Sequence, residues 1–254
     1  MKRFITYLVM LFAAVVVAKG AETTPAERWE AGNKAYIEGK YNDAAVAYRS
    51  ILEDGEYSVE LYYNLANAYF KMDSIGKAIL YYNKALRIDP SSADIEHNLA
   101  LAEAKTKDRI KALPEFFLTG WLKSIRNGMS CMAWSIISLL LLAAFLASTL
   151  LFLLASQIGL RKGGFYGALC SFVLFVAATL FAISSRNDML SHDEAVVMIS
   201  AIAVKSSPDR SASDLFVLHE GTKLKVVAEM DEWCEIVIAD GKKGWTERKN
   251  IEEI

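Results

Sequence analysis

Two long apolar runs lie close together in the middle of this 254-residue chain and restrict what it can fold into. Residues 131–155 and residues 165–183 contain no charged side chain, over 25 and 19 positions. A helix rises about 1.5 Å per residue and the apolar core of a bilayer is about 30 Å thick, so each run can cross it. We therefore predict transmembrane helix 1 and transmembrane helix 2. The alternative is a buried hairpin in a soluble core, which the rest of the chain is too short to surround.

The N-terminus and the segment between the runs predict the orientation. Residues 1–20 have a basic start, an apolar core and small residues at the end, which is typical of a signal peptide. An uncleaved anchor is the alternative, and either would export the chain from Ala21 on. Two spans then return the chain to the same side, so residues 156–164, with Arg161 and Lys162, are predicted to form a cytoplasmic loop. The predicted location is the inner (cytoplasmic) membrane, with both polar domains periplasmic.

Basic residues before the first span favour the opposite orientation. Lys123 and Arg126 both lie within ten residues of it. A long domain behind an export signal is translocated largely regardless of its charge, so we give the signal peptide more weight.

An internal repeat with an offset of 34 residues precedes the hairpin. The offset aligns small and aromatic residues in pairs: Gly32 with Ala66, Asn33 with Asn67, Ala44 with Ala78, and Tyr48 with Tyr82. The pattern resembles the tetratricopeptide repeat, a helix pair with small residues where its helices touch. The resemblance implies an α-helical domain over residues 21–112, with repeats at about 25–58 and 59–92. Residues 93–112 are expected to be a capping helix, because repeat arrays need a covered end. An unrelated helical bundle is the alternative.

The resemblance to tetratricopeptide repeats also implies a groove that binds proteins. The first helix of each repeat lines the groove, and the implied residues here are Trp29, Asn33, Tyr36, Tyr63, Asn67, Phe70 and Lys71. Some members of the family grip the C-terminal carboxylate of a peptide with asparagine and lysine side chains. Asn33, Asn67 and Lys71 match that pattern in part, whereas Leu101 in the third copy does not. The alternative is that both asparagines only cap or bridge neighbouring backbone. A groove this small suits a short peptide or one partner helix.

The juxtamembrane segment, residues 113–130, mixes basic and apolar residues and is interrupted by Pro114. Apolar residues recur near helical spacing over residues 115–127. We predict a helix on the bilayer surface, with Trp121 at the depth of the headgroups. An amphipathic helix that packs on the repeat domain is the alternative.

Short alternating runs separated by turn residues begin at Ala195 and predict five short strands in a small barrel. Four motifs, at residues 204–208, 218–222, 233–236 and 240–245, resemble the bacterial SH3 domain in that order. The motif residues are Gly221, Trp233, Gly241, Gly244 and Trp245. The resemblance implies binding of cell-wall peptide or of a protein. The predicted fold class is thus a multidomain membrane protein with an α-helical tetratricopeptide-repeat domain, a transmembrane helical hairpin and a small all-β SH3-like barrel at 195–254.

Composition and motifs argue against several other functions. The net charge is −2, and residues 195–254 carry eight basic and eleven acidic side chains, which gives nucleic-acid binding no support. The cysteines form no C-x-x-C pair, and Cys234 is expected to be a free structural thiol rather than a reactive one. Catalytic pairs, phosphate-binding glycine loops and metal-ligand spacings are also missing from the sequence. We therefore expect a protein that is not an enzyme, with no cofactor and no bound metal.

The order of the parts resembles the BatE-type proteins of the Bacteroides aerotolerance operon. The resemblance implies membrane partners with von Willebrand A domains and a role in envelope or oxidative stress tolerance. The predicted function is a membrane-anchored periplasmic scaffold that binds protein partners through its repeats and contacts the lipid bilayer through its hairpin. The alternative is a wall-sensing module whose SH3-like domain binds peptidoglycan peptide.

Overall fold

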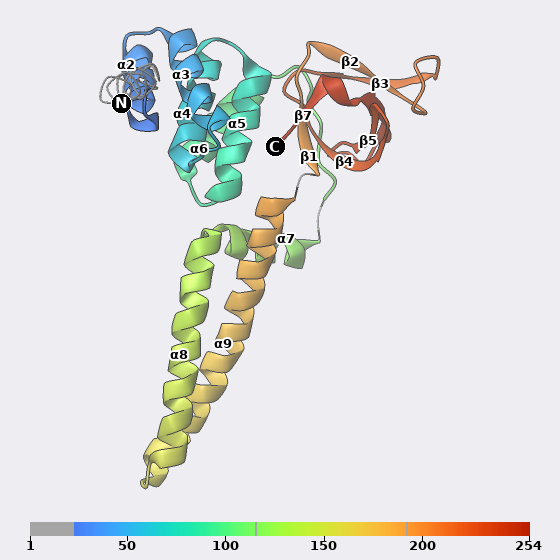
Figure 1. Ribbon diagram of the computed structural model, residues 1–254. Helices are drawn as coiled ribbons and strands as arrows, with labels where there is room; N and C mark the ends of the chain where they lie inside the picture. The colour runs from blue at the N-terminus through green and yellow to red at the C-terminus, as the bar shows by residue number, and fades with distance from the viewer. Residues whose placement is uncertain (1–22, 115, 192) are drawn as a thin grey trace, which may run out of the picture. The chain divides into compact units, whose positions relative to one another are not determined.

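The computed structural model describes residues 23–114, 116–191 and 193–254, so the predicted signal peptide lies outside the described residues (Figure 1). The chain divides after Glu56 into two units, and each is described by itself.

The first unit contains a pair of helices, α2 (Pro25–Ile37) and α3 (Tyr41–Glu53). A capping box starts α2, because the Thr24 side chain accepts a bond from the Glu27 N–H while the Glu27 carboxylate accepts one from the Thr24 N–H. Arg28 of α2 donates to the Ser50 carbonyl at 2.8 Å and forms an ion pair with Asp54. These contacts hold the two helices of the first repeat together.

The second unit begins with α4 (Val59–Lys71), α5 (Ile75–Ile88) and α6 (Ala93–Glu103). The Ser58 side chain caps α4 by accepting a bond from the Leu61 N–H. Small and apolar side chains fill the contact between α4 and α5, and Leu65, Ala66, Ala78 and Ala85 are fully buried. The predicted capping helix is shorter than expected, since α6 ends at Glu103 rather than at residue 112. The residues that follow α6 bind the barrel instead, as described below.

Helix α7 (Phe117–Asn127) forms where a surface helix was predicted, and none of its residues is buried. It is followed by α8 (Cys131–Leu154) and α9 (Ile158–Leu190), which pair along their length (Figure 1). The Ser138 and Thr179 hydroxyls are 2.7 Å apart across this pair. By length and composition, both α8 and α9 could cross a membrane.

The expected loop at 156–164 is mostly helical. Helix α9 starts at Ile158, so Arg161 and Lys162 lie in its first turns. In the sequence, Gly163 and Gly164 stand at the end of the predicted loop. Gly164 instead allows close approach of α8, because a Cβ there would lie 2.5 Å from the Phe152 nitrogen.

The C-terminal part of the second unit is an antiparallel sheet with the strand order β3-β2-β6-β5-β4-β1-β7. The strands are β1 (Glu194–Val197), β2 (Ala201–Lys205), β3 (Asp214–His219), β4 (Lys223–Met230), β5 (Trp233–Val237), β6 (Lys243–Glu247) and β7 (Ile251–Glu253). A short 3-10 helix, η1 (Arg248–Asn250), precedes β7. Alternate residues such as Ile202, Val204 and Ile236 point into one apolar core.

The sheet has two more strands than the sequence predicted. The expected first strand, from residue 195 to 204, is broken between Val197 and Ala201, so it forms both β1 and β2. Strand β7 was missed because its sequence, Ile-Glu-Glu, contains only one apolar residue.

Candidate functional site

Both helix pairs contain the same side-chain hydrogen bond at the same 34-residue offset. The buried Tyr48 hydroxyl donates to Asn33 Oδ1 at 2.8 Å, and the buried Tyr82 hydroxyl donates to Asn67 Oδ1 at 2.6 Å. The same bond thus recurs in both helix pairs at the 34-residue offset. Both asparagines bridge the two helices of their own repeat, and they do so through a tyrosine side chain rather than through backbone.

A third amide joins this network in the second unit. Asn98 of α6 donates through Nδ2 to the Tyr63 hydroxyl at 2.7 Å and to Asn67 Oδ1 at 3.3 Å. Asn98 is not among the predicted groove residues, because the position compared in the third copy is Leu101, one turn later. The 34-residue offset aligns Asn98 with Asn64, and this was the signal available. Both bonds end on the Asn67 oxygen, and within residues 23–114, 116–191 and 193–254 its NH₂ group donates no hydrogen bond.

The C-terminal end of α4 carries the aromatic ring of Phe70, and a cation from beyond α6 lies over this ring. The Lys105 ammonium lies 4.6 Å from the centre of the Phe70 ring and forms a 2.8 Å ion pair with Asp73. Lys71 is exposed. We call Tyr63, Asn67, Phe70 and Lys71 the α4 face. It combines donors and an aromatic surface, as a peptide-binding site requires.

The first unit contains the other three predicted groove residues. Trp29, Asn33 and Tyr36 are half-buried on α2, and the Trp29 ring centre lies 5.6 Å from that of Tyr48. The Tyr36 ring packs edge-on against Tyr41, with ring centres 5.3 Å apart.

The predicted SH3 motif residues lie at the turns and on the strands of the sheet. Gly221 and Gly241 have φ values of +84° and +87°, in the left-handed region that favours glycine. Gly244 is buried, and a Cβ there would lie 2.5 Å from Val204 Cγ1. Trp233 and Trp245 are half-buried and alternate with inward-facing residues. These residues therefore shape the fold, and the two tryptophans also reach its surface.

Cys234 faces the core of the sheet and is 2% exposed. Burial raises the pKa of the Cys234 thiol, with a further contribution from the Glu229 carboxylate. Since the thiolate is the reactive form, both observations favour a structural thiol.

Asp108, in the segment after α6, holds the turn between β3 and β4. Its carboxylate accepts bonds from the His219 N–H at 2.7 Å and the Thr222 hydroxyl at 2.6 Å, and lies 2.7 Å from His219 Nδ1. Burial opposes the charged form, but the bonds from Thr222 and His219 outweigh it, so the pKa of Asp108 lies below its usual value. Sequence reasoning missed this contact because no local pattern links residues 111 positions apart.

The same segment continues along the sheet. Ile110 packs on the apolar core, and the Leu113 N–H donates to the Ala239 carbonyl at 3.0 Å. Residues 108–113 are thus part of the barrel. Helix α5 also contacts the β3–β4 turn, because the Gly76 N–H donates to Glu220 Oε1 at 2.9 Å.

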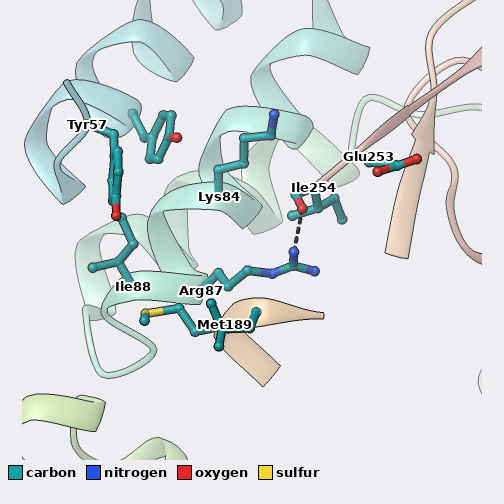
Figure 2. A pocket seen from close by; sticks show the side chains of 9 residues that line it. Tyr57, Lys84, Arg87, Ile88, Met189, Glu253 and Ile254 are labelled. Carbon is teal, nitrogen blue, oxygen red and sulfur yellow. Dashed lines mark hydrogen bonds between the residues drawn. The ribbon is translucent and has the colours of Figure 1, made fainter. Parts of the chain in front are cut away.

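A pocket of about 420 Å³ lies between α5, the end of α9 and β7 (Figure 2). Arg87 donates to the Ser191 carbonyl at 2.6 Å and to the Ile254 carbonyl, and lies 3.6 Å from the Glu194 carboxylate. Figure 2 shows Lys84 directed away from the bond between Arg87 and Ile254. Burial lowers the pKa of Lys84, and no carboxylate among the described residues forms an ion pair with it. No cluster of three or more potential metal ligands occurs in residues 23–114, 116–191 and 193–254.

Comparisons with known families agree with this geometry. The family model of the tetratricopeptide repeat matches residues 59–92, which include α4 and α5. The family model of the bacterial SH3 domain matches residues 200–252, which include β2 to β6. The chain contains a tetratricopeptide repeat and a bacterial SH3 domain. No curated protein matches the chain. Both matched modules point to binding, and tetratricopeptide repeats in particular to protein–protein interaction.

Proposed function

We propose that the chain is a non-enzymatic scaffold, anchored in the inner membrane, that binds protein partners in the periplasm through its repeats. The α4 face carries this proposal, because the exposed Lys71 lies one turn beyond Asn67 on the same helix and follows the half-buried Phe70 in sequence. The apolar exposed helices α8 and α9 support the anchor. The order of the modules supports partners with von Willebrand A domains and a role in envelope or oxidative stress tolerance, as in the BatE-type resemblance.

Replacement of Lys71 by alanine is expected to weaken partner binding about ten- to a hundredfold. A hydrogen bond to a charged group contributes about 1.5–3 kcal/mol, and 1.4 kcal/mol corresponds to a factor of ten. The partner is first identified by affinity purification of the full chain in mild detergent. Its affinity for purified wild type and Lys71→Ala is then measured.

Lys77→Ala is the matched control, because Lys77 is an exposed lysine of α5 outside the α4 face. Equal affinities for Lys71→Ala and wild type would refute the α4 face as the binding site. The full chain is also incubated with purified cell wall. Retention on the wall without any protein partner would favour the alternative function, peptidoglycan binding by the SH3 domain.

The orientation is expected to place both polar domains in the periplasm. An alkaline phosphatase fused after Ile254 should be active, because an exported N-terminus and two spans return the chain to the same side. A second fusion at Gly163 should be inactive. Activity at Gly163 together with inactivity after Ile254 would show that the orientation is reversed.

A further inference from the structure

The turn between α8 and α9 carries two basic residues that the chain around them does not neutralise. Arg161 and Lys162 lie in the first turns of α9 and are exposed. Neither forms an ion pair with another described residue, and the stretch between Glu115 and Asp188 contains no acidic residue. The opposite end of the hairpin differs, because Arg126 forms a 2.6 Å ion pair with Asp188 there. An anion bound at the turn would therefore meet no competing carboxylate in this stretch.

The two cations line a pocket of about 270 Å³ together with aromatic and apolar side chains. The lining residues are Phe152, Ile158, Arg161, Lys162, Phe165 and Tyr166. The Arg161 guanidinium lies 5.7 Å from the centre of the Phe152 ring, and the Phe152 and Phe165 ring centres are 5.9 Å apart. Tyr166 packs edge-on against Phe165, with ring centres 5.5 Å apart. A guanidinium over a ring keeps its N–H groups in its own plane, where they can donate to an anion.

The start of α9 adds positive charge at the same end of the helix. The first N–H groups of a helix have no acceptor within it, and the helix dipole makes this end positive. The residue before α9, Gln157, makes no capping bond with its side chain. These backbone groups therefore strengthen the attraction of Arg161 and Lys162 for an anion.

The pocket lies at the depth of the lipid headgroups if α8 and α9 cross a bilayer. At the opposite end of the hairpin, polar contacts begin at Ser184, whose hydroxyl accepts a 2.9 Å bond from an arginine that follows α7's last turn. Gly164 lies twenty residues earlier on α9, which is about 30 Å and matches the apolar core. Lys162 and Arg161 are two and three residues further out, about 3–5 Å beyond that core, and Ile158 is about 9 Å beyond it. The polar layer is about 5–8 Å thick, so both cations lie within it.

We propose that this pocket binds the phosphate of an anionic phospholipid, with Arg161 and Lys162 as the donors. The glycerol region would lie against the rings of Phe165 and Tyr166, where the charge-free run of α9 begins. Basic pockets between membrane helices are suited to such headgroups. A zwitterionic lipid binds more weakly here, because its own cation competes with the two side chains for the phosphate.

The lipid site rests on the membrane anchoring proposed above, but it does not depend on the orientation of the hairpin. The turn between α8 and α9 meets the headgroups of one leaflet in either orientation. A bound lipid would hold the turn at a fixed depth, because the phosphate cannot enter the apolar core.

The test is native mass spectrometry of the full chain, purified in mild detergent and supplied with phosphatidylglycerol or phosphatidylcholine. Wild type should retain phosphatidylglycerol preferentially. The double variant Arg161→Gln, Lys162→Gln should lower this retention about ten- to a hundredfold, as expected for the loss of hydrogen bonds between charged groups. The measurement in detergent is independent of orientation, which the loss of two basic residues could otherwise change.

Three further variants separate a site from a general effect of charge. Arg161→Lys combined with Lys162→Arg keeps both charges and should keep binding. Arg161→Gln alone should lower retention. Arg186→Gln is its matched control, because Arg186 is an exposed arginine near the other end of α9, outside the pocket, and its loss should leave retention unchanged.

Unchanged retention by the double glutamine variant, or an equal loss in Arg161→Gln and Arg186→Gln, would overturn the proposal. Inorganic phosphate is added in a separate arm, and displacement of the lipid at equal concentration would show a phosphate site instead of a lipid site. The anchoring is tested independently by washing membranes at alkaline pH. Release of wild type would refute the anchor, whereas wild type that stays in the membrane, with unchanged lipid retention by the double variant, would refute only the lipid site.

Discussion

Replacement of Asp108 by alanine is expected to destabilise the barrel by about 2–4 kcal/mol, because charge-assisted hydrogen bonds contribute about 1.5–3 kcal/mol each. The change removes the acceptor of the His219 N–H and of the Thr222 hydroxyl. Thr222 is 6% exposed, so water replaces the lost partner poorly. The segment with Ile110 would also lose its attachment to the core.

Hydrogen exchange of residues 214–224 in the full chain, in mild detergent, measures the effect. A loss of about 2 kcal/mol or more corresponds to roughly 30-fold faster exchange. Asp240→Ala is the control, because Asp240 is a barrel carboxylate whose ion pair with Lys242, at 3.0 Å, lies at the surface. If residues 214–224 exchange equally fast in the Asp108→Ala and Asp240→Ala variants, residues 108–113 are not part of the barrel.

The stabilisation that Asp108 gives to the β3–β4 turn is expected to decrease as the pH falls. The pKa of Asp108 lies below its ordinary value of 3.8 in the folded chain. Its stabilisation is therefore complete above the unfolded pKa and is lost as the pH falls through the folded pKa. Asparagine at this position does not titrate. The difference in unfolding temperature between wild type and Asp108→Asn should narrow from about pH 6 to about pH 2.

The parts of the fold that the sequence predicted are those with a local repeating pattern. The apolar runs predicted α8 and α9, and the 34-residue offset predicted the two helix pairs. The bond from each tyrosine to an asparagine was not predicted. Alternation of apolar residues predicted β3 to β6 within about one or two residues. Apolar residues recur with different periods in helices and in strands. Their period therefore indicates both the type of element and the face that is buried.

The contacts that were missed join segments far apart in the chain. Asp108 binds residues 111 and 114 positions later, and Lys223 donates to Asn83 across 140 positions. No spacing rule connects such residues. Gly164 illustrates the same limit, since its sequence context indicated a loop while the neighbouring α8 backbone makes it a helix contact. The pocket near Lys84 also has no sequence signature, because four separate elements, α4, α5, α9 and β7, line it.

The predicted α4 face was only partly recognisable for a related reason. Its residues were inferred from their place in the repeat, and Asn67 accepts a bond from Tyr82 of the same repeat. The contribution of Asn98 depends on how α6 packs on α4, which the repeat pattern specifies less well at its last copy. The cation over Phe70 comes from Lys105, beyond the end of α6.

Replacement of Ala78 by leucine is expected to destabilise the second repeat by about 1–3 kcal/mol, because overpacking a filled core forces side chains off their rotamers. Ala78 is fully buried in α5, and Leu65 and Ala66 are fully buried in α4, the helix that packs on α5. The added side chain has no space there, so α4 and α5 must separate. Separation would also stretch the bond from Tyr82 to Asn67, which spans the same two helices.

Hydrogen exchange of residues 59–88 in the full chain measures this effect, with about 5- to 150-fold faster exchange expected for 1–3 kcal/mol. Ala100→Leu is the matched control, because Ala100 is an exposed alanine of α6 and should leave exchange unchanged. Lys71→Ala should also leave it unchanged, since Lys71 is exposed. Faster exchange in Lys71→Ala together with wild-type exchange in Ala78→Leu would reverse the assigned faces of the repeat. The α4 face could then not be the binding surface, because its lysine would support the fold instead of meeting a partner.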